Sequence, residues 1–153
     1  VKGLELNAQY ELSFLPAPFD GFSVSGNITF VDSKASGLPS RSDEIPLINQ
    51  ADRVASAQLS YEKYGFSARL AYTYRSSALD EANEEDPEGD VYLDDFKQWD
   101  IKFGYAFNPR FSIFLEGSNL NDAAMRTYVG QRNRLGEKEI YGWSARAGIQ
   151  LTF

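Results

Sequence analysis

The sequence contains neither cysteine nor histidine. Without histidine the chain cannot form Ser–His or Cys–His nucleophile pairs, and without cysteine it cannot form disulfides or thiolate metal sites. We therefore expect no catalytic residue, no metal site and no cofactor, and we expect that the protein is not an enzyme. The chain also lacks the apolar run of about 18 residues that a transmembrane helix needs. This does not exclude a membrane location, because membrane-spanning strands alternate and look polar on average.

A basic stripe is missing as well. The net charge of −7 comes from residues 80–95, which hold nine acidic residues and no basic one. Nucleic-acid binding is therefore not expected, because nothing is available to neutralise phosphates. The composition of 80–95 favours a solvated, partly disordered surface loop. The alternative is a Ca²⁺ site, but the EF-hand spacing is absent. Asp94 and Asp95 do not suit glycoside hydrolysis, because adjacent acids in a strand point to opposite faces.

Aromatic residues are abundant, at 14%, and the last fourteen residues, IYGWSARAGIQLTF, show how they are arranged. Successive side chains of a strand point to opposite faces, so residues 141–153 present one apolar face and one small or polar face. The apolar face continues to the terminal Phe153. This ending is typical of outer-membrane β-barrel proteins.

The same alternation recurs along the chain and predicts an all-β fold. We expect an antiparallel up-and-down meander of about seven strands, part of a larger transmembrane β-barrel. The expected strands span about 3–15, 22–31, 52–62, 66–75, 96–107, 111–119 and 140–153.

The connections and the charges distinguish this pattern from a soluble sheet. Short and long connections alternate, as short periplasmic turns and long extracellular loops do in outer-membrane barrels. Aromatic residues gather near the short turns like an interfacial girdle, so we place the apolar face against lipid. Phe114 is an exception on the polar face. The polar face then lines the lumen, where its charges could form ion pairs, contact a plug or line a substrate path; they are Arg69, Asp100, Lys102, Glu116 and Arg146.

Several segments resemble the C-terminal end of TonB-dependent outer-membrane receptors. They are the first strand VKGLELNAQYEL, the segment SIFLEGSNLND at 112–122, then Tyr128 and Gly130-Gln131-Arg132, and the closing strand YGWSARAGIQLTF. The resemblance implies a barrel of about 22 strands that is filled by an N-terminal plug. It also implies binding and import of a scarce nutrient, such as an iron–siderophore complex, cobalamin or an oligosaccharide, with energy from the TonB complex.

Residues 1–153 show neither a plug nor a TonB box, so we expect the C-terminal part of such a barrel in the bacterial outer membrane. Its expected partners are membrane lipid, the plug and N-terminal barrel strands of the parent protein, and the TonB complex through that plug. Two open sheet edges also predict edge-to-edge association of the isolated piece.

The last long loop supplies the candidate ligand-binding residues, which are Arg126, Tyr128, Arg132 and Arg134. They could contact an anionic or sugar ligand through charge and ring stacking. They could instead pair with the acidic segment or with lipopolysaccharide phosphates. The alternative function is that of a complete small β-barrel binding protein, either lipocalin-like and soluble or a small outer-membrane barrel.

Overall fold

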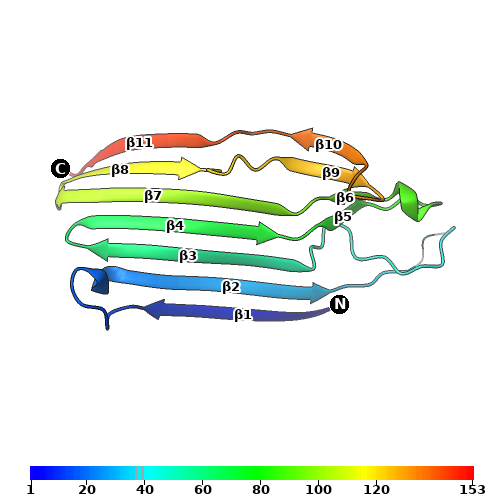
Figure 1. The fold of residues 1–153 in the computed structure, drawn as a ribbon, viewed down its shortest axis with the longest axis horizontal. Helices are drawn as coiled ribbons and strands as arrows, with labels where there is room; N and C mark the ends of the chain where they lie inside the picture. Colours follow the sequence, from blue (N-terminus) through cyan, green and yellow to red (C-terminus); the bar gives the residue numbers. More distant parts are fainter. Residues whose placement is uncertain (37, 39) are drawn as a thin grey trace.

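The computed structural model describes residues 1–36, 38 and 40–153, and its main element is one antiparallel seven-stranded sheet (Figure 1). Its strands lie in chain order, as predicted for an up-and-down meander, but the sheet does not close into a barrel. They are β1 (Lys2–Glu11), β2 (Phe22–Asp32), β3 (Arg53–Lys63), β4 (Phe66–Arg75), β7 (Phe96–Asn108), β8 (Phe111–Ser118) and β11 (Ser144–Leu151).

The register keeps the two faces separate. Cross-strand neighbours point to the same face, so apolar residues pair with apolar ones, as Phe66, Tyr105 and Ile113 do across β4, β7 and β8. The short turns help to set this register. At the β3–β4 turn, Tyr64 and Gly65 both have positive φ (55° and 78°), the combination that a two-residue type I′ hairpin requires.

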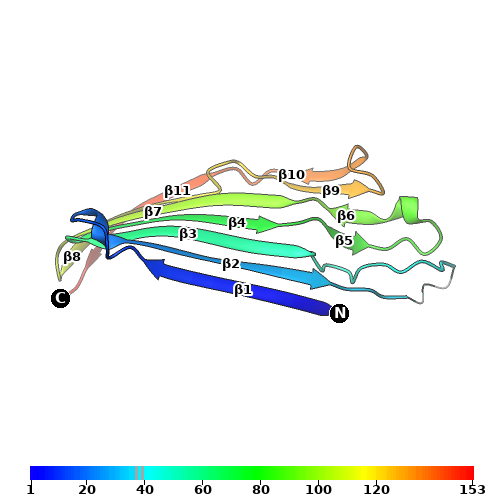
Figure 2. The same cartoon turned by 60° about the horizontal axis from the view of Figure 1, so that its bottom comes forward.

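The long connections are more structured than the sequence indicated. They contribute a second sheet of four short strands, ordered β10-β9-β6-β5, at the far end of the first sheet (Figures 1 and 2). We call it the long-loop sheet; its strands are β5 (Ala78–Glu81), β6 (Val91–Leu93), β9 (Met125–Val129) and β10 (Leu135–Glu139). The prediction of a partly disordered loop over 80–95 was therefore wrong. This segment forms the end of β5, the 3-10 turn η2 (Pro87–Gly89) and β6.

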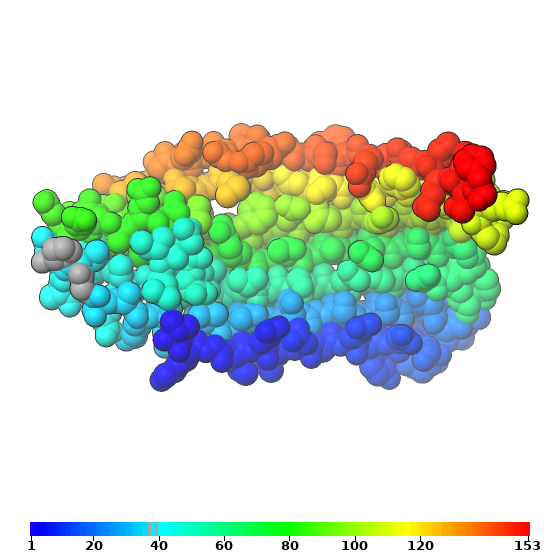
Figure 3. Space-filling view, turned by 180° about the vertical axis from the view of Figure 1, so that it is seen from behind, coloured from blue at the N-terminus to red at the C-terminus, as the bar shows by residue number. Residues whose placement is uncertain are grey.

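The two sheets differ in burial. The seven-stranded sheet is a single layer whose strands lie side by side from the N-terminus to the C-terminus (Figure 3). Its apolar residues are largely exposed, including Leu6, Leu115 and Ile149. Among the described residues, the buried apolar side chains instead belong to the long-loop sheet or, for Ala51, to the connection between β2 and β3: Ala51, Ala78, Leu79 and Tyr128.

The described part of the chain includes two short 3-10 turns, η1 (Phe19–Gly21) and η2, and it has no helix that is long and apolar enough to cross a bilayer.

Candidate functional site

A row of polar residues crosses the whole seven-stranded sheet on its polar face. The strand registers place one residue from each strand opposite its neighbour in the next. Four of the five predicted lumen residues fall in the second half of this row, where cations outnumber carboxylates. In strand order the row is Glu11, Ser23, Ser60, Arg69, Lys102, Glu116 and Arg146.

Glu116 is the centre of an ion-pair cluster in this row. Lys102 Nζ lies 2.6 Å from one carboxylate oxygen of Glu116, and Arg146 Nε donates to the other at 2.9 Å. Both cations therefore share a single carboxylate. The structure brings together three of the predicted lumen residues that are far apart in the sequence.

Asp100, the predicted lumen residue that lies outside this row, makes hydrogen bonds with other groups. Its carboxylate accepts hydrogen bonds from Ser118 Oγ at 2.6 Å, from the Asn119 backbone N–H at 3.0 Å and from the Gln98 amide at 2.8 Å. Arg69 is exposed beside these groups and directly opposite Lys102. Together the five predicted residues line one groove of about 600 Å³ on the polar face.

Phe114, the apolar exception on the polar face, lies against a glycine. It is opposite Gly148 in the register, and a Cβ at position 148 would come within 2.5 Å of the Phe114 ring. The ring thus occupies the space that glycine leaves open. Lys102 Nζ and the Arg146 guanidinium lie 5.8 and 6.0 Å from the ring centroid. Both cations that pair with Glu116 therefore also make a cation–π contact with Phe114.

The segment Asn119-Leu120-Asn121-Asp122 ends β8 with side-chain amides. Asn121 accepts from the Trp99 backbone N–H and donates to the Lys97 carbonyl, so its amide continues the pairing of β7 beyond the end of β8. Asn119 has a φ of 55° and donates to the Gly142 carbonyl at 3.0 Å. It therefore ties the end of β8 to the start of β11.

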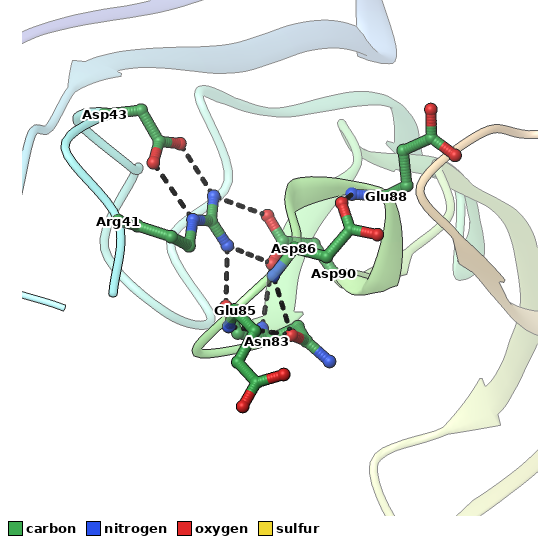
Figure 4. A network of polar contacts seen from close by, with 7 residues as sticks. All are labelled: Arg41, Asp43, Asn83, Glu85, Asp86, Glu88 and Asp90. Atoms are coloured by element: carbon green, nitrogen blue, oxygen red, sulfur yellow. Dashed lines mark hydrogen bonds and ion pairs between the residues drawn. The ribbon is translucent and has the colours of Figure 1, made fainter. Parts of the chain in front are cut away.

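A buried ion pair holds the long-loop sheet to the connection between β2 and β3 (Figure 4). The Arg41 guanidinium donates to both carboxylate oxygens of Asp90, at 2.6 and 3.1 Å, although 49 residues separate them in the sequence. It also donates to the Asn83 carbonyl and to Asp43. The side chains of Arg41 and Asp90 are only 3% and 2% exposed.

These contacts favour the charged forms of Arg41 and Asp43. The hydrogen bonds that Arg41 donates to Asp43 and Asp90 raise the pKa of Arg41, and the hydrogen bond from Arg41 lowers the pKa of Asp43. Burial raises the pKa of Tyr92, the next residue but one after Asp90. Sequence reasoning missed Arg41; its only signal was a lone arginine in a polar stretch of a chain that has one strongly acidic segment.

The four candidate ligand-binding residues are distributed over the long-loop sheet. Arg132 lies 2.9 Å from Asp95 and 3.4 Å from Asp94, and Arg134 donates to the Glu88 carbonyl at 3.3 Å. Both arginines thus contact the acidic segment.

The other two candidates differ in exposure. Tyr128 is buried and stacked on Tyr92, with ring centroids 5.2 Å apart, whereas Arg126 is exposed on β9. The structure places all four on β9 or the turn that follows it, and the Arg132 guanidinium lies 5.8 Å from the centroid of the Tyr128 ring.

The fold and its faces define a class of protein. An antiparallel meander with one largely apolar face, one charged and hydrogen-bonded face, short turns at one end and long structured loops at the other is typical of outer-membrane β-barrels. A family model described as "TonB dependent receptor-like, beta-barrel" matches residues 1–120, which is most of the chain. The protein belongs to this family, and the chain is a portion of an outer-membrane receptor.

Comparison with curated proteins and with solved structures gave no significant match. The matched range includes β1 to β8 and ends within the Asn119–Asp122 segment. The resemblance of Tyr128, Gly130-Gln131-Arg132 and the closing strand lies outside the matched residues and stays a prediction.

Proposed function

We propose that residues 1–153 form the C-terminal part of a TonB-dependent receptor barrel that binds a scarce nutrient and imports it across the outer membrane. The nutrient is an iron–siderophore complex, cobalamin or an oligosaccharide, and the TonB complex supplies the energy. One observation carries this proposal: in a chain of this family, the charges away from the strand ends lie on one face of an open sheet, while the other face is largely apolar and exposed.

The open edges support a larger barrel. The outer edges of β1 and β11 carry unpaired backbone groups, and each such group costs several kcal/mol in lipid. In the complete receptor, these two edges would pair with other barrel strands. The alternative of a complete small barrel requires β1 and β11 to pair with each other, and in the structure they are opposite edges of one sheet.

The experiment is uptake by cells that carry the receptor. Labelled ferric siderophore, cobalamin and oligosaccharide are supplied to cells with the receptor, without it, and with the receptor but without functional TonB. We expect accumulation of one nutrient only when both receptor and TonB are present. Binding without any TonB-dependent accumulation would contradict the proposed import and leave a binding protein.

A further inference from the structure

The second half of the polar row has more positive than negative charge. Arg69, Lys102 and Arg146 lie in one row with a single carboxylate, Glu116, which already pairs with Lys102 and Arg146. The neighbouring Asp100 engages its carboxylate with Ser118, Asn119 and Gln98. Counting both acids, the groove that these residues line has an excess of one positive charge.

Arg69 and Lys102 are direct cross-strand neighbours on this face. Like charges directly opposite each other destabilise a strand pair. Glu116 and the Phe114 ring both lie on β8, so they draw the Lys102 ammonium away from Arg69, which is on β4. The one carboxylate of the row is therefore engaged away from Arg69, and among the described residues no carboxylate pairs with the exposed Arg69 guanidinium.

We propose that Arg69, together with Lys102, binds a carboxylate group in this groove. A guanidinium offers a planar fork that matches a carboxylate. One carboxylate also neutralises the excess of one charge. The groove, at about 600 Å³, has room for a small organic acid or for an acidic side chain of a covering segment. This inference requires the barrel but not the proposed import, so the two can fail separately.

Thermal unfolding of the intact receptor, purified from outer membranes in detergent, tests the proposal. The variants are Arg69→Gln and, as a matched control, Arg110→Gln in the exposed β7–β8 turn. Each is measured in sodium chloride and in sodium succinate of equal ionic strength. If no anion is bound, Arg69→Gln relieves its repulsion with Lys102 and the melting temperature stays the same or rises.

Two results support a bound carboxylate and distinguish its source. If an acidic side chain of the receptor occupies the groove, Arg69→Gln lowers the melting temperature by several degrees in chloride, and succinate changes neither protein. If a free organic acid binds, succinate raises the melting temperature of the unsubstituted receptor, and Arg69→Gln abolishes that rise. The proposal is overturned if Arg69→Gln melts like Arg110→Gln, or higher, in both salts.

Discussion

The two sheets of this protein obtain their stability in different ways. The long-loop sheet has a small interior, in which Leu79 is 1% exposed and Asp90 is 2% exposed and paired with Arg41. The seven-stranded sheet has backbone pairing and polar contacts on one face, but its apolar face covers nothing within the described chain. The long-loop sheet is therefore stabilised by its own packing, and the seven-stranded sheet depends on its surroundings. The predictions below test this contrast, from the largest expected effect to the smallest.

Arg41→Ala should destabilise the long-loop sheet locally. It leaves Asp90 buried without a counter-ion, and breaking a buried ion pair is strongly destabilising. We expect amide hydrogen exchange over 78–93 to accelerate by roughly tenfold or more, with β1–β4 unchanged. Lys34→Ala, which breaks the exposed pair with Glu44, is the control and should have little effect. Equal acceleration in both sheets would contradict separate stabilisation.

Leu6→Arg tests the dependence of the seven-stranded sheet on lipid. Leu6 is exposed on the apolar face, and an arginine on the lipid face of a barrel costs about 2–4 kcal/mol near the bilayer midplane. Asn7→Arg, one residue further on and on the polar face, should cost much less. Unfolding of the receptor in lipid vesicles measures both. If Asn7→Arg is the more destabilising of the two, our assignment of the faces is inverted.

Gly148→Ala tests the close contact between the Phe114 ring and the glycine opposite it. The added Cβ would meet the Phe114 ring, and overpacking of this kind costs about 1–3 kcal/mol. The displaced ring would also disturb Lys102 and Arg146. We expect a lower melting temperature for the receptor and unchanged exchange in the long-loop sheet. Recovery by the double variant Gly148→Ala with Phe114→Ala would confirm the contact, because removing the ring also removes the clash.

Acidification should lower the stability of the long-loop sheet only slightly, and only at low pH. Contact with Arg41 lowers the pKa of Asp43 below its ordinary value of 3.8, and Lys97 and then Arg132 lower that of Asp95. A group whose pKa is lowered by folding stabilises above its ordinary pKa and loses this contribution as the pH falls through the lowered value. Protease resistance of 78–95 should therefore stay constant from pH 8 to about 5 and decline below about 4. A decline between pH 7 and 5 would require another titrating group.

The strands of the main sheet were predictable because their signal is local. Leu4, Leu6 and Tyr10 alternate with polar residues, and such a pattern needs no information from another strand. The long-loop sheet was not predictable in the same way. β5 ends, and β6 lies, in an acidic segment whose composition favours solvation. β6 pairs with β9, and Arg41 from another connection pairs with Asp90 beside it.

The candidate site was also predictable only in part. The sequence placed Arg69, Asp100, Lys102, Glu116 and Arg146 on one face, and the structure gathers all five around one groove. The sequence could not show that Glu116 pairs with two cations, or that Arg69 lies opposite Lys102, because partners across a sheet depend on register.

By itself, the sequence determined the strands of the seven-stranded sheet, their two faces and the absence of histidine and cysteine chemistry, because side-chain alternation and composition are properties of the chain alone. Only the tertiary structure decided the rows of facing residues, the slot between Phe114 and Gly148, and the pairing of Arg41 with Asp90. Each of these joins residues that are distant in the chain, and their meeting depends on strand register and loop closure, which no local pattern specifies.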